Sequence, residues 1–485
     1  MPLKNDAPEQ GSLKSPQEPA LRALYKKTFG PEPDTFEPLR ADASARRLFR
    51  LGDGKRTAVG VFGPDKAENR AFLSFSGQFR AAGLPVPEIY AEDQAQGIYL
   101  EEDLGSTTLF EYLSAERKGP ELPPQVMAAY LKVLDWLPKF QAQVKAGLDL
   151  RHCYPRAAFD RQSVMWDLNY FKYYFLKLAK IPFNEDKLEA DFSRFADLLL
   201  EAPSDHFLYR DFQSRNIMLR DGEPWFIDYQ GGRRGAAQYD VASLLYDAKA
   251  DLQPEDRASL REAYLKASGQ DAGGFMRYYY AFVYARIMQA MGAYGLRGFY
   301  ERKTHFLASV PYAVRNIEWL LRNAELPVKL PELTACFKRI AASSYLRQFG
   351  KSRLGLTVRV TSFSFKNGVP LDDRGHGGGF VFDCRALPNP GRYEQYAQLT
   401  GRDKPVADFL KGEAEVERFL RGVFAITGQS VENYLSRNFT SLSVSFGCTG
   451  GRHRSVYCAE ALAAHLRKNY GARVELTHRE LGPAR

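Results

Sequence analysis

The stretch "LYRDFQSRNIML" (residues 208–219), followed closely by "PWFIDYQ" (residues 224–230), decides the fold that we expect. Asp211 stands between apolar runs, Asn216 follows five positions later, and Asp228 follows twelve positions after that. Burying a charged group costs free energy unless it is paired or hydrogen-bonded. Carboxylate and amide groups at the ends of apolar runs therefore indicate a built polar site.

Transfer of a γ-phosphoryl group depends mainly on positioning and on neutralising charge. Asp211 is predicted to receive the proton of the acceptor hydroxyl. Asn216 and Asp228 are predicted to bind Mg²⁺ through hard oxygen atoms. Arg210 is expected to orient the loop, with an ion pair to a surface acid as the alternative. The bland alternative is that the three side chains form only turns and a helix cap.

The surrounding sequence predicts strands between Phe36 and Glu102, interrupted by one helix over "DKAENRAFLSFSGQFRAAG" (residues 65–83). Residues 109–200 read as helical, and further helices follow the motif. We expect Trp166, Tyr170 and Tyr173 to pack in the core, with stacking on a sugar ring as the alternative. A new strand-led segment begins near residue 356, so a domain boundary is predicted near residue 350.

The motif "YRDFQSRN…FIDYQ" resembles that of the aminoglycoside phosphotransferase and choline kinase superfamily. Within it, "ADASARRLFRL", "AAGLPVPEIYAED" and "YDVASLLYDAK" most resemble the anomeric N-acetylmuramate and N-acetylglucosamine kinases. The likeness covers most of Phe36–Asn323. It implies an α/β (α+β), bilobal, protein-kinase-like fold. It also implies ATP and Mg²⁺ as cofactors and a sugar or amino-sugar hydroxyl, with the anomeric one expected, as the acceptor in cell-wall sugar recycling or nucleotide-sugar supply.

The resemblance also has departures. "TAVGVFGP" (residues 57–64) lacks the strand Lys that such kinases use to hold phosphates, and Tyr209 replaces the usual His of the loop. The resemblance implies that Asp240 braces the catalytic loop from the following helix. Another cation must replace the strand Lys, with Lys66 as a further local candidate. The residues expected at the nucleotide are Ser44 in a glycine-free turn, Arg46, Arg47 and, as their acidic partner, Glu68.

A second polar motif, "SVSFGCTGGRHRSVYCAEALAAHL" (residues 443–466), reads as a strand, a Gly-rich turn and an amphipathic helix. Backbone N–H groups at such a turn, together with a helix N-terminus, form an anion site. The spacing of Cys448 and Arg454 also matches cysteine phosphatases, in which a thiolate attacks phosphorus. The residues expected to bind a phosphate group are Cys448, Thr449, Gly450, Gly451, Arg452, His453, Arg454 and Ser455.

Nearly all of Leu356–Gly482 resembles the C-terminal domain of RapZ-type proteins, with "GCTGGRHRS" as the most specific stretch. That resemblance implies binding of glucosamine-6-phosphate, contacts with protein partners and a part in RNA binding. The P-loop ATPase half of that family is replaced here by the kinase-like half, and the basic tail tied to RNA is not evident. We therefore expect a tail over 1–30, a kinase domain over 31–330, a linker over 331–352 and a phosphosugar-binding domain over 353–485.

Composition sets broad limits on these expectations. The 485 residues include 45% hydrophobic and 26% charged residues and carry a net charge of +9. The part from Ser352 onward holds 19 Lys+Arg against 13 Asp+Glu, which favours an anionic ligand such as phosphate or nucleic acid. Five scattered cysteines, no apolar run long enough for a bilayer and no secretory signal predict a reduced, cytoplasmic protein without a membrane partner.

Three hypotheses follow. The first is an ATP-dependent sugar or amino-sugar kinase fused to a phosphosugar-sensing domain. The second is a regulatory protein whose kinase half is degenerate and which senses a phosphosugar or nucleotide and contacts RNA or a protein. The third is a cysteine phosphatase that uses Cys448 and Arg454.

Overall fold

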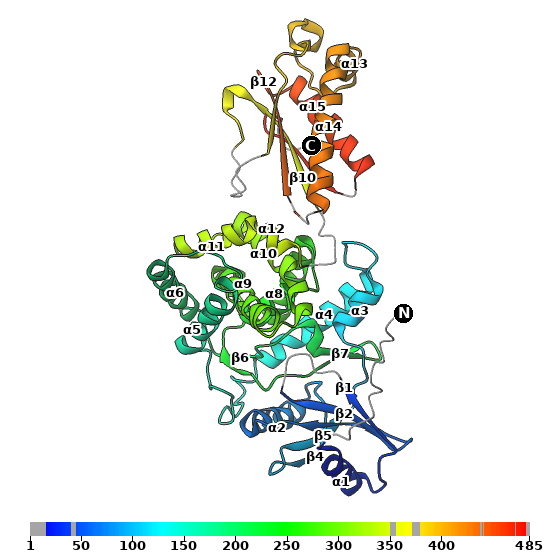
Figure 1. Ribbon diagram of the computed structural model, residues 1–485, viewed down its shortest axis with the longest axis vertical. Coiled ribbons are helices and arrows are strands. Elements are labelled where there is room, and N and C mark those ends of the chain that lie inside the picture. The colour runs from blue at the N-terminus through cyan, green and yellow to red at the C-terminus, as the bar shows by residue number, and fades with distance from the viewer. Residues whose placement is uncertain are drawn as a thin grey trace, which may run out of the picture. The chain divides into compact units, whose positions relative to one another are not determined.

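The computed structural model describes residues 16–39, 45–349, 356–370, 379–436, 439, 441–470 and 472–481. The chain divides into two compact units. Its helices and strands are named here as they are labelled in Figure 1. The first unit contains residues 1–165 and 196–286, and the second contains residues 166–195 and 287–485. Helices α5 (Arg161–Tyr170), α6 (Glu185–Leu200) and α9 (Ala272–Tyr294) contain residues of both units.

The first unit contains an antiparallel sheet in the order β1-β2-β3-β5-β4. Its strands are β1 (Thr35–Leu39), β2 (Arg47–Gly52), β3 (Thr57–Phe62), β4 (Ile89–Asp93) and β5 (Ile98–Glu102). Helix α1 (Glu18–Phe29) buries Leu21 and Tyr25 against one face of this sheet. The expectation of a tail over residues 1–30 is therefore wrong for Glu18–Phe29, because the apolar side chains of this segment complete a core.

Helix α2 (Lys66–Ala81) begins at Asp65, whose side chain accepts hydrogen bonds from the N–H groups of Ala67 and Glu68. Successive side chains of a strand point to opposite faces. Leu100 of β5 packs in the core with α1, whereas Tyr99 stacks on Phe72 of α2, with ring centroids 5.4 Å apart. The two helices therefore contact different faces of the sheet.

The rest of the first unit holds two short antiparallel pairs and several helices. Strand β6 (His206–Leu208) pairs with β9 (Arg233–Gly235), and β7 (Ile217–Arg220) pairs with β8 (Glu223–Phe226). The loop between β6 and β7 contains the short 3₁₀ helix η2 (Ser214–Asn216). The helices are α3 (Leu109–Glu116), α4 (Pro124–Gln141), α7 (Gln238–Leu245) and α8 (Pro254–Ser268).

The second unit begins with two π-helical segments, η1 (Phe171–Leu176) and η3 (Gly295–Tyr300), and a 3₁₀ helix, η4 (Thr304–Ser309). Helices α10 (Val310–Asn323), α11 (Pro331–Ala342) and α12 (Ser344–Arg347) follow, and α10 packs against the other two. The expected linker over 331–352 is therefore wrong for its helical part, which buries apolar residues such as Phe337 and Leu346.

The aromatic residues of this segment also correct an expectation. Trp166 and Tyr173 are not core residues, because about half of each side chain is exposed. Instead, the amines of Lys172 and Lys177 lie over the aromatic ring of Tyr173. Tyr170 is partly buried and contacts the ring of Tyr174.

The C-terminal part of the second unit contains a four-stranded parallel sheet in the order β11-β12-β10-β13. Its strands are β10 (Thr357–Ser364), β11 (Phe380–Asp383), β12 (Ser441–Cys448) and β13 (Arg473–His478). Short 3₁₀ turns lie at η5 (Phe365–Asn367), η6 (Pro390–Arg392) and η7 (Glu394–Tyr396). The helices are α13 (Lys404–Lys411), α14 (Ala414–Ser436) and α15 (Arg454–Asn469).

Apolar residues of these strands and helices form one core, which includes Val358, Val444, Phe446 and Leu462. Burial on both faces is typical of parallel sheets, since helices cover them. Among the residues that the structure describes, none of the helices is long and apolar enough to span a bilayer.

Candidate functional site

The loop that follows β6 is held from below by a buried carboxyl group. Asp240 of α7 accepts hydrogen bonds from the backbone N–H groups of Tyr209 (2.8 Å) and Arg210 (3.0 Å). Burial raises the pKa of Asp240 to about 7, although the two N–H groups oppose this shift. The buried ring of Tyr209 lies within the same support, and its hydroxyl donates to the carbonyl oxygen of Ile227 (2.6 Å).

Arg210 adopts the left-handed backbone conformation, with φ at 81°. Its guanidinium lies over the rings of Phe159 and Tyr239 and donates to the Tyr239 hydroxyl (2.7 Å). A non-glycine residue at positive φ is strained and persists only where its surroundings hold it. These contacts agree with the interpretation of Arg210 as a residue that orients the loop.

The structure brings together the three polar residues of the opening motif. The side-chain amide of Asn216 donates to the backbone oxygen of Asp211 (2.9 Å) and to Oδ2 of Asp228 (3.2 Å). Asp228 stands two residues beyond β8 with φ at 70°, and its Oδ1 accepts from Gln230 Nε2 (2.8 Å). The β6–β7 loop and the residues that follow β8 therefore meet in one polar cluster, which contains Asp211, Asn216 and Asp228.

Arg46, just before β2, supplies a cation at this point. It donates to Asp228 Oδ1 and lies 3.8 Å from Glu68 Oε1 of α2. Burial alone would lower the pKa of Arg46, but Asp228, Tyr99 and Glu68 raise it above its ordinary value. Of the residues expected at the nucleotide, Arg46 and Glu68 are thus in contact, as the resemblance implies.

Arg47 and Ser44 are the other two residues expected at the nucleotide. Arg47 is exposed and donates to Gln17 Oε1 (3.3 Å), so the contact that it makes lies outside the cluster of Arg46, Glu68 and Asp228. Ser44 lies outside the described residues.

Two further residues of the site were missed by the sequence analysis. Glu101 of β5 is partly buried, and burial raises the pKa of its carboxyl to about 8, with Asp228 adding to the shift and Arg46 opposing it. Arg286 of α9 places Nη2 3.9 Å from Asp211 Oδ1. Neither residue belongs to a recognisable motif, and both are identified only by the groups that they face.

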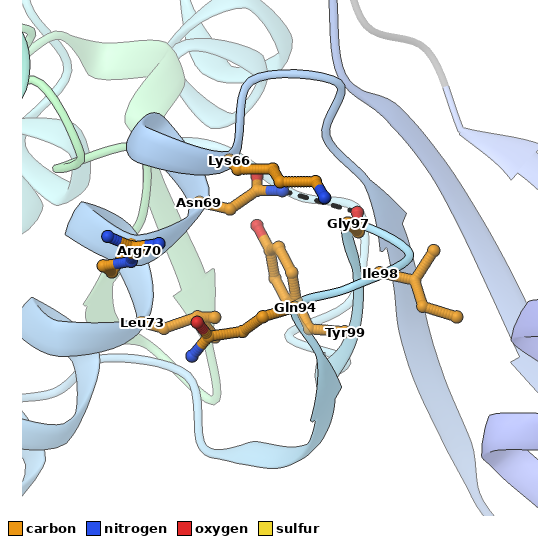
Figure 2. A pocket seen from close by; sticks show the side chains of 8 residues that line it. All are labelled: Lys66, Asn69, Arg70, Leu73, Gln94, Gly97, Ile98 and Tyr99. Carbon is orange, nitrogen blue, oxygen red and sulfur yellow. Dashed lines mark hydrogen bonds between the residues drawn. The ribbon is translucent and has the colours of Figure 1, made fainter.

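Lys66, the third local cation considered, lines a cavity between α2 and the β4–β5 turn (Figure 2). The empty space there is about 270 Å³, and Asn69, Arg70, Gly97 and Tyr99 also line it. The catalytic-loop residues do not line this cavity. The cation that contacts Glu68 is Arg46.

The donor set fits a divalent cation. Asp228 offers carboxylate oxygens, and Asn216 offers an amide oxygen, because its amide nitrogen makes the two hydrogen bonds described above. Mg²⁺ needs only one or two protein oxygen ligands when substrate phosphates and waters complete its shell. Among the described residues, no group of three or more His, Cys, Asp or Glu side chains forms a separate metal cluster.

The Gly-rich turn of the C-terminal sheet has the expected strand–turn–helix form. It joins β12 to α15, with Gly451 at φ 66°. Ser364 Oγ donates to the carbonyl oxygen of Thr449 (2.7 Å), and His453 Nε2 contacts the carbonyl oxygen of Tyr396 (3.1 Å). Thr449, Gly450 and Arg452 are exposed at this turn.

Arg454 and Cys448 lie behind the turn. Arg454 is 5% exposed and donates through Nη1 to the carbonyl oxygens of Arg385 (2.7 Å) and Leu387 (3.0 Å). Its Nε is buried without a hydrogen-bond partner in the described part of the chain. Cys448 is also buried, with Sγ 3.1 Å from Ser455 Oγ. Arg454 thus fixes the β11 end as well as backing the turn, and a thiol closed off in this way does not favour the phosphatase hypothesis.

The fold and the polar cluster define a phosphotransferase with a kinase-like α/β architecture. The chain belongs to the phosphotransferase enzyme family, whose signature matches residues 35–279, and the RapZ C-terminal domain matches residues 356–482. The resemblance to the phosphotransferase family, the resemblance to the RapZ C-terminal domain and the mixed α/β fold class are thereby confirmed.

Individual relatives each match about a quarter to a third of this chain. A nucleotide-binding protein of Acidithiobacillus ferrooxidans is 47% identical over 135 residues, or 26% of this chain and 41% of that protein. The RNase adapter protein RapZ of Serratia proteamaculans is 38% identical over 165 residues, or 34% of this chain and 55% of that protein. The chain therefore spans about half the length of the curated relatives it matches.

Among solved structures, choline kinase LicA from Streptococcus pneumoniae is similar at 14% identity, with a TM-score of 0.44. The match covers 62% of this chain and 98% of that chain.

Proposed function

We propose that the N-terminal domain is an ATP-dependent kinase for a sugar or amino sugar, with the anomeric hydroxyl as the expected acceptor. The observation that carries the proposal is the bridge formed by Asn216 between the Asp211 backbone and the Asp228 carboxylate. Family membership supports phosphoryl transfer, and the sugar acceptor is inferred from the resemblance of the sequence to the anomeric kinases.

In this mechanism the Asp211 carboxylate hydrogen-bonds the acceptor hydroxyl and takes its proton as the oxygen attacks phosphorus. Asp211 is suited to this role because its side chain is 39% exposed while its backbone is held by Asn216. Asn216 and Asp228 would hold Mg²⁺, which supplies charge neutralisation at the phosphates of ATP. Arg46, oriented by Glu68, takes the role of the missing strand Lys.

For the C-terminal domain we propose binding of a phosphorylated sugar at residues 448–455. Thr449, Gly450 and Arg452 provide an exposed hydroxyl, backbone N–H groups and a guanidinium. The buried, unpartnered Nε of Arg454 adds a donor behind them. A helix N-terminus with clustered donors favours an anion.

The experiment that tests the kinase is a ³¹P NMR product assay with Mg·ATP and a panel of hexoses and amino sugars. The wild-type protein is compared with Asp211→Asn, and the product spectrum reports both the substrate and the phosphorylated position. A phosphomonoester formed by the wild type alone supports the proposal. No product from any sugar contradicts it.

Fusion of the two domains motivates a regulatory link. Glucosamine-6-phosphate is expected to change the kinase rate, and both Arg452→Ala and Arg454→Ala are expected to abolish the change. Identical rates with and without this phosphosugar would remove the link while leaving the kinase proposal intact.

A second candidate function is a regulatory protein with a degenerate kinase half, in which the basic C-terminal part contacts RNA or a protein partner. The lack of a strand Lys and the engagement of Arg46 with Asp228 favour it. Calorimetry with Mg·ATP separates the two functions, because a degenerate site binds no nucleotide. A cysteine phosphatase would instead hydrolyse a generic phosphoester in a manner that Cys448→Ser eliminates.

A further inference from the structure

The cavity between α2 and the β4–β5 turn has one positively charged wall (Figure 2). Four of the eight residues that line it stand at positions i, i+3, i+4 and i+7 of α2 and so share one face of that helix: Lys66, Asn69, Arg70 and Leu73. The other four come from the turn and from β5: Gln94, Gly97, Ile98 and Tyr99. The charged residues among the eight are Lys66 and Arg70.

These two cations have no counter-ion within the described part of the chain. Both side chains are exposed, and neither forms an ion pair or a side-chain hydrogen bond with another described residue. Like charges four positions apart on a helix repel each other. An anion in the cavity would therefore relieve a repulsion that the folded protein otherwise retains.

The acidic side chains nearest in sequence have partners of their own. Asp65 caps α2 by accepting from two backbone N–H groups, and Glu68 faces Arg46. Before the turn, Glu92 accepts from Gln94 Nε2 (3.0 Å), and Asp93 accepts from Gln96 Nε2 (2.7 Å). None of these four carboxylates lines the cavity, so the charge on its wall is positive.

Asn69 fixes the shape of the cavity. Its side chain is 6% exposed, and its Nδ2 donates to the carbonyl oxygens of Gly63 (2.8 Å) and Gly97 (3.4 Å), which ties α2 to the turn (Figure 2). Its Oδ1 is buried and has no hydrogen-bond partner among the described residues. A buried acceptor without a donor costs free energy, and a hydroxyl or a monoprotonated phosphate in the cavity would supply that donor.

Size and charge together indicate the class of ligand. The empty space of about 270 Å³ lies just below the roughly 300–1,000 Å³ that is usual for sites of drug-sized ligands, so the cavity suits a small compound. A phosphate group carries up to two negative charges and several acceptor oxygens. It can therefore pair with an ammonium and a guanidinium at the same time.

Tyr99 connects the cavity to the proposed nucleotide site. Its ring is 1% exposed, lines the cavity and stacks on Phe72 of α2. Its hydroxyl hydrogen-bonds with Arg46, whose guanidinium lies 6.0 Å from the centre of the Phe72 ring. Arg46 in turn contacts Glu68 and Asp228. A ligand in the cavity thus stands one side chain away from the cation proposed to hold the phosphates of ATP.

We propose that this cavity is a regulatory site for a small phosphate-bearing anion, which Lys66 and Arg70 hold, and that its occupation raises the affinity of the nucleotide site for Mg·ATP. The expected sign follows from α2. A ligand that fixes Lys66 and Arg70 also fixes Glu68 between them, and Glu68 orients Arg46. The binding half of the proposal stands by itself, whereas the regulatory half rests on the proposed kinase function.

The binding half is tested by calorimetric titration of the full chain with inorganic phosphate and with glycerol phosphate, at constant ionic strength and without Mg²⁺. Every protein carries Arg452→Ala, which weakens the proposed phosphosugar site at residues 448–455. Lys66→Gln, Arg70→Gln and Arg70→Lys are compared in this background. Lys55→Gln is the matched control, because Lys55 is an exposed cation that does not line the cavity.

Lys66→Gln and Arg70→Gln are each expected to weaken phosphate binding at least about tenfold, the loss expected for a charged hydrogen bond. Arg70→Lys is expected to retain most of the affinity, and Lys55→Gln to retain all of it. Melting temperatures are expected to stay close to that of the background, because both lining cations are exposed. Tighter binding of either phosphate compound supports the proposal and tells the free ion from an organic phosphate as the preferred ligand.

A second readout locates the bound phosphate. In ¹H–¹⁵N TROSY spectra, phosphate is expected to shift the backbone amide signals of Gly97 and Tyr99, and this shift is expected to be absent in Arg70→Gln. Equal phosphate affinity in Arg70→Gln and Lys55→Gln would overturn the binding half. Unchanged signals of Gly97 and Tyr99 at saturating phosphate would also overturn it.

The regulatory half is tested through the dissociation constant of a non-hydrolysable ATP analogue with Mg²⁺. Saturating phosphate is expected to lower this constant at least about fivefold, and to leave it unchanged when Lys66→Gln and Arg70→Gln are combined. Tyr99→Phe is expected to keep the affinity for phosphate but to lose part of the effect, because the hydroxyl contact with Arg46 is removed.

A dissociation constant that stays the same with phosphate, or that rises as it would from competition at the nucleotide site, would overturn the regulatory half. If the protein binds no nucleotide at all, the kinase proposal fails and the regulatory half fails with it. The phosphate titration and the amide signals of Gly97 and Tyr99 then still decide whether the anion site exists.

Discussion

Arg46 donates a hydrogen bond to Asp228, although 182 positions separate the two residues. Arg46 also lies beside Glu68, so that one guanidinium joins α2 to the end of the β8 hairpin. The family resemblance places a strand Lys in this role, and the chain has none in β3. Arg46, which immediately precedes β2, is the cation that meets the helix Glu in this chain.

Replacing Arg46 with Ala is expected to weaken binding of Mg·ATP at least about tenfold, because it removes the guanidinium that contacts both Glu68 and Asp228. Arg46→Lys is expected to recover part of the affinity. Calorimetry measures both. Arg47→Ala is the matched control, since its side chain is exposed and pairs only weakly with Gln17. Equal losses from the two Ala variants would contradict the assignment.

Asp211→Asn is expected to lower kcat about 10²–10⁴-fold, the range for loss of a general base. KM for ATP is expected to change little, because Asp211 is not among the groups that contact Arg46. The thermal midpoint should also stay close to the wild-type value, as the side chain is 39% exposed. Steady-state kinetics and a melting curve check both points. A variant with full activity would contradict the proposed role of Asp211 as the general base.

Asp240 gives a prediction for pH dependence. Its pKa is raised from 3.8 to about 7 in the folded protein, so the folded state retains a proton that the unfolded chain has already lost. The contribution of Asp240 to stability is therefore fully present below about pH 4 and is lost as the pH rises toward about 7. The free energy of unfolding, wild type minus Asp240→Asn, should decrease between about pH 4 and about pH 7.

The opposite trend in that difference would mean that the two backbone N–H groups affect the pKa of Asp240 more than burial does.

Asp240→Ala is a separate test of how much the hydrogen bonds from the loop backbone to Asp240 stabilise the protein. It leaves the N–H groups of Tyr209 and Arg210 without their partner and should cost about 2–5 kcal/mol of stability. Urea unfolding measures this cost, and a variant as stable as the wild type would show that the brace is dispensable.

The two arginines of the C-terminal turn should behave differently. Arg452→Ala is expected to weaken phosphosugar binding about tenfold without changing stability, because the side chain is exposed. Arg454→Ala is expected to lose both binding and stability, since it also removes the donors to Arg385 and Leu387. Calorimetry with glucosamine-6-phosphate and thermal melting separate the effects. Stability losses of equal size would contradict the distinction.

Much of the organisation follows from local sequence. The spacing of apolar residues predicted α2, and the alternation of side chains predicted β2 and β3. Glycines next to a helical pattern predicted the strand–turn–helix at Gly451. The spacing of Asp211, Asn216 and Asp228 was enough to expect them at one point, and the structure brings Asn216 into contact with both partners. Such features need only a few neighbouring residues to specify them.

What the sequence by itself determined, then, is the family and the identity of the polar residues in its motifs. Only the tertiary structure decided that Arg46 and not Arg47 meets Asp228, that Glu18–Phe29 form a core helix, that Arg454 is buried and that Arg286 faces Asp211. The physical reason is that charge pairing and burial depend on which distant segments pack together. Local hydrogen bonds and hydrophobic periodicity depend on neighbouring residues, and they do not specify those long-range contacts.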